Sequence, residues 1–185
     1  MLYYFGKFWF WLFGWKVAKR YPTHIKKCVM VAAPHTSNWD FSFAMCTFFI
    51  MRLRIRFLAK HTLFGWPLKY IMYPLGGIPV NRSTSGNLVD YMVDLFNKNE
   101  ALIMLIPVEG TRSYVKEWKT GFYHTALKAG VPIVLGYLDY KKKESGCDEV
   151  FYPTGNYEAD LQVMKAYFSQ VTPKYPEKAS VNPIA

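Results

Sequence analysis

Cysteine is scarce in this 185-residue chain, with three residues at wide spacings, Cys28, Cys46 and Cys147. Their number is odd and no pair forms a C-x-x-C motif, so the sequence indicates no disulfide framework. The four histidines are equally scattered and show no metal-ligand spacing. A chain of this length buries most of its apolar surface on folding and needs no covalent or metal staple. These features indicate a single domain in a reducing compartment.

Acidic residues are nearly absent from the first half of the chain. Residues 1–92 carry 12 Lys or Arg but only 2 Asp or Glu, whereas residues 93–185 carry 11 of each. The net charge of +10 therefore belongs to the N-terminal half. Such a basic region suits an anionic membrane surface, and nucleic acid is the alternative anionic partner. Because no RNA-recognition, zinc-finger or helix-turn-helix signature accompanies the charge, we expect no nucleic-acid partner.

The N-terminus lacks an apolar run long enough to cross a membrane. Leu2–Trp15 contains nine aromatic residues but would form a helix of only about 21 Å, short of the ~30 Å hydrocarbon core. It also lacks the basic leader and cleavage site of a signal peptide. Basic residues follow it at once: Lys16, Lys19, Arg20, Lys26 and Lys27. We predict that residues 1–20 form an in-plane anchor helix on membrane lipids, at the cytoplasmic face of a peripheral or monotopic protein. The alternative is a helix packed on the domain's own core.

The remainder, residues 21–185, is predicted to form one domain in which strands alternate with helices. Strands are predicted at Cys28–Ala33, Arg54–Ala59, Ile78–Val80, Ala101–Val108 and Pro132–Tyr140. Helices are predicted at Trp39–Met51, Leu88–Asn97, Gly121–Ala129 and Tyr157–Ser169. This alternation is typical of an α/β domain with a mostly parallel central sheet flanked by helices. In such sheets, ligands bind beyond the carboxyl ends of the strands.

The first predicted strand continues into a histidine-containing loop with the sequence PHTSNWD, in which His35 and Asp40 are five positions apart. On one continuous helix these side chains would point about 140° apart, so they meet only if His35 stays in the loop and Asp40 lies in the first helical turn. The carboxylate then holds one ring nitrogen, and the other becomes a base for a substrate hydroxyl. This predicts a catalytic pair, with a helix cap beside a loop histidine as the alternative.

Polar sequences follow two other predicted strands. The segment Glu109–Arg112 follows Ala101–Val108, which places a carboxylate at the same sheet edge as His35 and a guanidinium group suited to phosphate. The segment Gly76–Arg82 ends in another arginine after an apolar step. Three polar sequences at strand ends favour one active site over three unrelated surface loops.

Taken together, these segments resemble the glycerol-phosphate and lysophospholipid acyltransferase family, especially its bacterial 1-acylglycerol-3-phosphate acyltransferase type. Four blocks match in the family's order: His35-x4-Asp40, Gly77–Arg82, Glu109–Arg112 and Val131–Val134. The similarity extends from Cys28 to Tyr140, and the sequence after Tyr140 departs from the family's pattern.

The resemblance implies an activity and a set of site residues. His35 would be the general base and Asp40 its orienting partner. The implied substrate-binding residues are Lys60, Arg82, Glu109, Gly110, Thr111 and Arg112. The implied reaction moves a fatty acyl group from acyl-CoA or acyl carrier protein to the hydroxyl of a lyso-lipid, first of all 1-acylglycerol-3-phosphate, in phospholipid biosynthesis. No metal or other cofactor is implied. The implied fold is a seven-stranded, mostly parallel sheet with an N-terminal helical element at the membrane.

Several alternatives stay open. One alternative acceptor lacks a phosphate, as in a lyso-amino-acid lipid, and another alternative is a hydrolase in which water replaces the acceptor. His35, Asp40 and Glu109 are chemically capable of forming a mixed metal site. A basic membrane- or nucleic-acid-binding module without catalysis is the remaining class. The chain has no G-x-S-x-G elbow, so we expect direct transfer without an acyl-enzyme.

Overall fold

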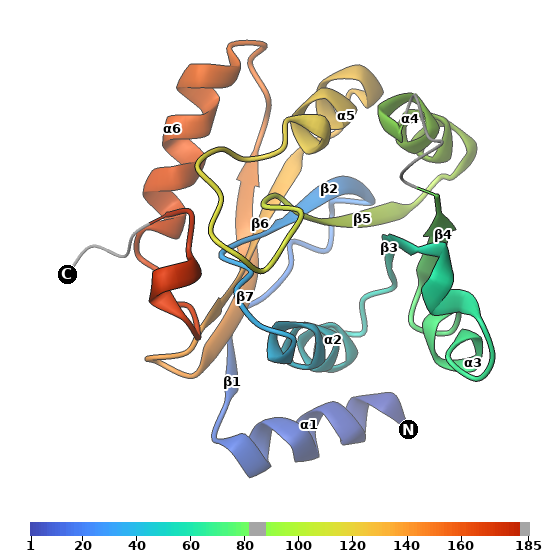
Figure 1. Cartoon of the computed structure of the whole chain (residues 1–185), viewed down its shortest axis with the longest axis vertical. Coiled ribbons are helices and arrows are strands. Elements are labelled where there is room, and N and C mark those ends of the chain that lie inside the picture. Colours follow the sequence, from blue (N-terminus) through green and yellow to red (C-terminus); the bar gives the residue numbers. More distant parts are fainter. Residues whose placement is uncertain (82–87, 182–185) are drawn as a thin grey trace.

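A seven-stranded sheet forms the centre of the computed structural model, which describes residues 1–81 and 88–181 (Figure 1). Within those residues the strand order is β1-β7-β6-β2-β5-β3-β4. The strands are β1 (Lys16–Lys19), β2 (Lys27–Ala32), β3 (Ile55–Lys60), β4 (Gly77–Val80), β5 (Leu102–Pro107), β6 (Ile133–Asp139) and β7 (Glu144–Phe151). Strands β6, β2, β5, β3 and β4 run parallel, whereas β7 is antiparallel to β6. The predicted α/β class with a mostly parallel sheet is confirmed.

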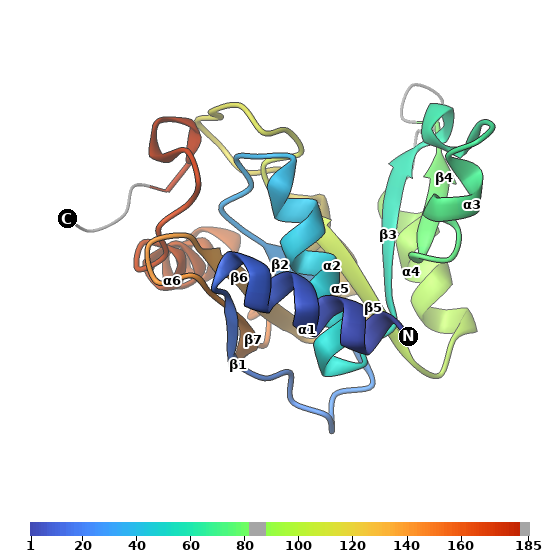
Figure 2. The same cartoon turned by 90° about the horizontal axis from the view of Figure 1, so that it is seen from below.

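Helices cover both faces of the sheet. The α-helices are α1 (Leu2–Phe13), α2 (Trp39–Met51), α3 (Lys69–Met72), α4 (Leu88–Lys98), α5 (Gly121–Ala129) and α6 (Tyr157–Phe168), and the 3-10 helices are η1 (His61–Phe64) and η2 (Pro176–Lys178). Helices α4, α5 and α6 pack on one face of the sheet, the upper one in Figure 1, and α2 packs on the other, which faces the viewer in Figure 2. Alternate residues of β2 point into these two cores, as Val29 and Met30 show. This explains why β2 is a continuous apolar run rather than an alternating one.

The N-terminal segment differs from the predicted anchor helix of residues 1–20. The helix ends at Phe13 because Gly14 adopts a left-handed conformation with φ 70°. Residues Lys16–Lys19 then form β1, an edge strand that pairs with β7. Pairing with β7, which is distant in sequence, turns this short basic segment into a strand. The role of α1 as an anchor stays a prediction.

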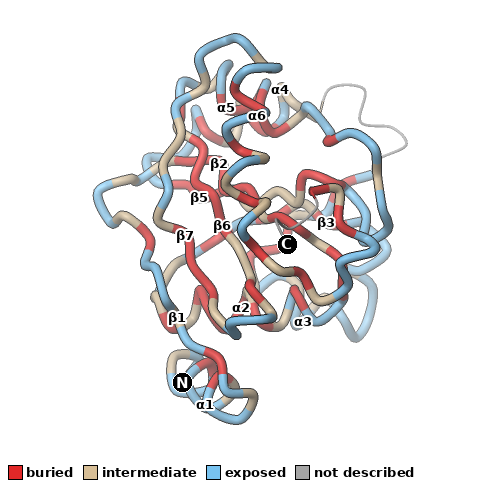
Figure 3. The backbone as a smooth tube through the Cα atoms, turned by 90° about the vertical axis from the view of Figure 1, so that its left-hand side faces the viewer, coloured by how far each residue is buried: buried red, intermediate tan, exposed pale blue. Residues whose placement is uncertain are grey.

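Helix α1 lies against the outer side of α2 and has two dissimilar faces (Figure 3). On the packed face, Phe10 is buried, and a Cβ added at Gly6 would approach the Cys46 carbonyl oxygen to 2.9 Å. On the other face, large apolar residues are exposed: Leu2, Tyr4, Phe5, Phe8, Trp11 and Leu12. Among the residues described, no helix combines the length and apolar character needed to cross a bilayer.

Candidate active site

The carboxyl ends of the parallel strands bring distant parts of the chain to one edge of the sheet. Strands β2 and β5 pair in register up to Ala32 and Pro107. His35 follows β2 and Glu109 follows β5, so the two segments continue side by side. The backbone N–H of His35 donates a hydrogen bond to Glu109 Oε1 over 3.3 Å.

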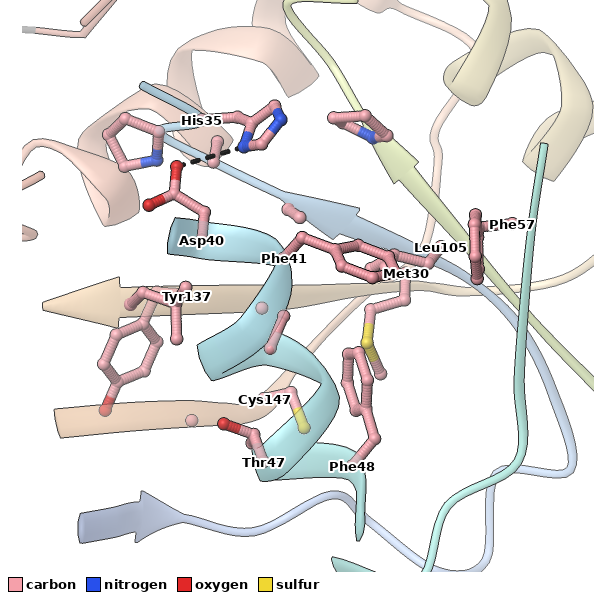
Figure 4. Close-up of a pocket in the computed structure, with 18 of the residues that line it drawn as sticks. Met30, His35, Asp40, Phe41, Thr47, Phe48, Phe57, Leu105, Tyr137 and Cys147 are labelled. Carbon is pink, nitrogen blue, oxygen red and sulfur yellow. Dashed lines mark hydrogen bonds and ion pairs between the residues drawn. The ribbon is translucent and has the colours of Figure 1, made fainter. Parts of the chain in front are cut away.

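His35 and Asp40 are in direct contact. His35 lies in the loop before α2, Asp40 lies in the first turn of that helix, and His35 Nδ1 is 3.1 Å from Asp40 Oδ2 (Figure 4). This is the arrangement predicted from the five-residue spacing. Because a carboxylate only accepts hydrogen bonds, Nδ1 carries the proton and Nε2 is left as the basic nitrogen. The catalytic role of the pair stays a prediction.

The Asp40 carboxylate is held at both oxygens. Oδ2 accepts hydrogen bonds from the backbone N–H groups of Thr36 and Ser37, each over 2.9 Å, in addition to the contact with His35. Oδ1 accepts a 2.7 Å hydrogen bond from the hydroxyl of Tyr140. Asp40 is only 5% exposed, so the fixed carboxylate interacts with His35 under limited solvent screening. Sequence reasoning did not find Tyr140, because it lies 100 positions from Asp40 and matches no motif.

Glu109 is buried beneath the His35 loop. Its Oε1 accepts hydrogen bonds from the His35 backbone N–H and the Ser180 hydroxyl, and that hydroxyl accepts one from Trp118 Nε1. Oε2 has no hydrogen-bond partner among the described residues. Burial raises the pKa of the Glu109 carboxyl. The hydrogen bonds of Glu109 are therefore made to other parts of the chain, namely the backbone of the His35 loop and Ser180 in the C-terminal segment. Its predicted contact with the acceptor stays a prediction.

Arg112 lies beside the start of α2. Its guanidinium donates a hydrogen bond to Asn38 Oδ1. Together with Lys178 it lines a polar surface pocket of about 390 Å³. The other residues lining this pocket are Thr36, Ser37, Asn38, Trp39, Ser113 and Tyr175. Since Thr36 directly follows His35, the pocket adjoins the His35–Asp40 pair.

The other predicted binding residues are more dispersed. Lys60 ends β3, is exposed, and pairs with Val80 of β4, so it lies on a different strand end from Arg112. Gly110 has φ +66°, a backbone conformation that favours glycine. Thr111 is exposed and its hydroxyl accepts a weak 3.4 Å hydrogen bond from the Ser113 N–H. Arg82 lies outside the described residues.

An apolar cavity of about 140 Å³ extends from the His35–Asp40 pair between α2 and the sheet. His35 and Asp40 lie at one end of it, and Thr47, Phe48 and Cys147 lie towards the other (Figure 4). Side chains of α2, β2, β3, β5, β6 and β7 contribute to its wall. No local sequence pattern could reveal it, because the contributing residues meet only in the folded sheet.

The cavity contains one thiol, that of Cys147, and burial raises its pKa to about 12. The thiol therefore stays protonated at neutral pH and is a poor nucleophile. Across residues 1–81 and 88–181, no three His, Cys, Asp or Glu side chains are grouped as metal ligands would be. What the contacts provide at this site is a histidine whose Nδ1 is held by Asp40 beside an apolar cavity, an arrangement suited to general-base chemistry.

Comparison with known proteins links this geometry to a family. The sequence model of the Acyltransferase family matches residues 16–135. The chain is 30% identical over 133 residues to the 1-acyl-sn-glycerol-3-phosphate acyltransferase of Haemophilus influenzae, covering 66% of this chain and 53% of that protein. It is 32% identical over 132 residues to the enzyme of the same name from Escherichia coli, covering 66% and 52%. The chain thus spans about half the length of the curated relatives it matches.

A solved structure shares the fold. The crystal structure of the 1-acyl-sn-glycerophosphate (LPA) acyltransferase PlsC from Thermotoga maritima matches with a TM-score of 0.61 and 18% identity. The match covers 89% of this chain and 74% of that one. At this identity the similarity concerns the fold.

Proposed function

Because this chain belongs to the acyltransferase family, we propose that it transfers a fatty acyl group from a thioester to the free hydroxyl of 1-acylglycerol-3-phosphate in phospholipid biosynthesis. The observation that carries this proposal is the His35–Asp40 pair at the end of an apolar cavity. An acyl chain in that cavity would place its thioester carbonyl beside His35. The comparisons give no support to a non-phosphorylated acceptor or to a non-catalytic binding module.

The proposed transfer takes place in one covalent exchange. His35 Nε2 removes the proton of the acceptor hydroxyl as its oxygen attacks the thioester carbonyl. Asp40 stabilises the imidazolium that forms. The resulting oxyanion collapses, the C–S bond breaks, and the thiolate leaves and takes up the proton from His35. An ester bond replaces the thioester bond, and the products are a diacylated lipid and a free thiol. No cofactor takes part in this scheme.

Acyl-CoA and acyl carrier protein are both suitable donors in this proposal. The basic N-terminal half, with 12 Lys or Arg against 2 Asp or Glu in residues 1–92, would attract either the phosphates of coenzyme A or an acidic carrier protein. Kinetics with each donor in turn will separate the two.

The test of the function is an assay of the purified protein with labelled acyl-CoA or acyl carrier protein and a panel of monoacyl lipids. Lysophosphatidic acid, monoacylglycerol and a lyso-amino-acid lipid are the acceptors, and mass spectrometry identifies the products. We expect phosphatidic acid. Release of free fatty acid alone would indicate a hydrolase, and acylation of the lyso-amino-acid lipid alone would contradict the proposed acceptor.

Recognition of the acceptor phosphate is proposed for the pocket that Arg112 lines. The pocket holds two cations, Arg112 and Lys178, and no carboxylate among its lining residues. Replacing Arg112 with glutamine removes a charged, bidentate donor and leaves a shorter, uncharged amide. We expect kcat/KM for lysophosphatidic acid to fall by about 10- to 150-fold, which corresponds to roughly 1.5–3 kcal/mol for one charged hydrogen bond.

The measurement compares lysophosphatidic acid with uncharged monoacylglycerol for wild type and Arg112→Gln. Lys116→Gln is the matched control, because Lys116 is an exposed cation on the same loop that does not line the pocket. Equal losses on the two acceptors would show that Arg112 shapes the loop and does not read the phosphate. Arg82→Gln, at the second predicted arginine, is tested in the same assay.

Membrane association is proposed for the exposed face of α1, at the cytoplasmic surface of a lipid bilayer. Tyr4, Phe8 and Trp11 are 74%, 56% and 75% exposed. Their spacing of four and three residues places them on one side of the helix, away from buried Phe10. Tyr and Trp at this position suit the membrane interface, and the basic residues that follow suit anionic head groups.

Replacing Tyr4, Phe8 and Trp11 together with serine is expected to lower binding to anionic vesicles by at least about tenfold, because each aromatic ring contributes roughly 1.5–3 kcal/mol when fully buried in an apolar phase. Flotation with phosphatidylglycerol-containing vesicles measures the effect, and the packed face of α1 is left intact. Tyr152→Ser with Val163→Ser is the control, since both residues are exposed and lie outside α1. Undiminished flotation of the α1 variant would place the membrane contact elsewhere.

A further inference from the structure

Tyr140 belongs to none of the matched motifs, yet it contacts the catalytic pair. It directly follows β6 and lies beyond residues 16–135, the range that the Acyltransferase family model matches. Its hydroxyl donates a 2.7 Å hydrogen bond to Asp40 Oδ1. The other oxygen of Asp40 faces His35. Tyr140 therefore binds the carboxylate at the oxygen that the histidine does not use.

The ring of Tyr140 is fixed from several sides. Trp15 packs edge-to-face on it at a centroid distance of 4.9 Å, and Phe43 does so at 5.9 Å. The Tyr140 backbone N–H donates to the Thr172 carbonyl over 2.8 Å, and Lys174 Nζ lies 5.8 Å from the ring centroid. Residues from α2, from the segment after α1 and from the C-terminal segment thus hold the hydroxyl in place.

The orientation of the Asp40 carboxylate plane depends on rotation about its Cα–Cβ and Cβ–Cγ bonds. The hydrogen bonds from Thr36, Ser37 and His35 all converge on Oδ2 and restrain this rotation at one oxygen only. The hydrogen bond from Tyr140 holds Oδ1 and restrains the same rotation from the opposite side. The plane then directs an Oδ2 lone pair at His35 Nδ1, which favours the tautomer that leaves Nε2 free as a base.

We propose that Tyr140 is a positioning residue, which sets the orientation of the Asp40 carboxylate and thereby the tautomer of His35. The catalytic consequence rests on the proposed acyl transfer, whereas the tautomer effect does not. Burial and the adjacent Asp40 carboxylate raise the pKa of the Tyr140 hydroxyl above its ordinary value, so it remains a protonated donor at neutral pH.

The test is Tyr140→Phe, which keeps the ring and its packing and removes only the hydroxyl. We expect kcat to fall about tenfold, because general-base catalysis supplies about 10²–10⁴-fold and the variant retains a loosened base. The KM values for donor and acceptor should stay within about twofold, because Tyr140 touches neither substrate in this scheme. The matched control is Tyr157→Phe, a half-buried tyrosine on α6 outside the site.

Nitrogen-15 NMR of the imidazole rings measures the tautomer ratio of His35. This ratio should not change on Tyr140→Phe if Tyr140 only supports the fold. The His35 signals are assigned by their absence in His35→Ala. In wild type and Tyr157→Phe we expect the Nδ1–H tautomer to dominate, and in Tyr140→Phe the share of the Nε2–H tautomer should rise about threefold or more. An unchanged tautomer ratio would overturn the proposal, whether or not kcat falls. Failure of wild type to transfer acyl groups would overturn the proposed function instead, and the NMR comparison would still decide the role of Tyr140.

Discussion

Replacement of His35 with alanine is expected to lower acyl transfer by about 10²–10⁴-fold, the usual contribution of a general base. The folded structure should persist, because the side chain of His35 is 24% exposed and fills little of the core. The backbone N–H that donates to Glu109 also remains. Initial rates with the preferred donor and acceptor measure the loss, while circular dichroism and thermal unfolding show that the variant is folded.

His124→Ala is the matched control for this variant. His124 is an exposed residue of α5 that lines neither the apolar cavity nor the polar pocket. Its replacement should leave the rate within about twofold of wild type, as expected of a surface substitution away from the site. Transfer by His35→Ala within tenfold of the wild-type rate would contradict the proposed mechanism.

Replacement of Asp40 with asparagine is expected to lower the transfer rate by a similar factor, about 10²–10⁴-fold. The asparagine oxygen can still accept the hydrogen bonds from Thr36 and Ser37, so the loop should keep its shape. The variant nevertheless lacks the negative charge that stabilises the imidazolium. An amide group turned the other way would point an N–H towards His35 and favour the wrong tautomer.

Steady-state kinetics with a thermal unfolding curve test the Asp40→Asn variant. Asp90→Asn is the control, because the side chain of Asp90 is only half-buried, pairs with Lys128 and lines neither pocket. We expect the loss to appear in kcat rather than in KM, since Asp40 acts through the base. An unimpaired kcat would contradict this role and would show that Asp40 only caps the turn at the start of α2.

Local sequence patterns determined most of the secondary structure. The nine elements predicted in residues 21–185 are present, with ends that agree within one or two residues. Strand β2 was recognisable because a strand covered on both faces must be apolar throughout. Strand β7 was not recognised, because its sequence ESGCDEVF mixes glycine and charge, and pairing with β6 is what makes it a strand. Strand β1 depends in turn on β7.

The contact between His35 and Asp40 was also predictable from the sequence. His35 and Asp40 are five positions apart, so the geometry that joins them depends on one loop and one helical turn. The ordered blocks after the strand ends likewise predicted the family, and the match over residues 16–135 confirms it. Such short-range geometry is determined by residues that are close together along the chain.

Sequence could not decide the two faces of α1. Its apolar residues run all round the helix, which fits both a membrane anchor and a core helix. The structure assigns Phe10 to the contact with α2 and leaves Trp11 exposed. The position of α2 decides which apolar residues of α1 are buried, and the sequence of α1 does not contain that information.

The sequence by itself determined the strand–helix alternation, the family and the His35–Asp40 pair, because each rests on residues that are close along the chain. Only the tertiary structure decided that Tyr140 contacts Asp40, that Ser180 contacts Glu109 and that an apolar cavity opens beside His35. These features join residues separated by tens of positions, and no local pattern constrains such contacts. They exist because parallel strands bring their carboxyl ends together and because the C-terminal segment returns to that edge of the sheet.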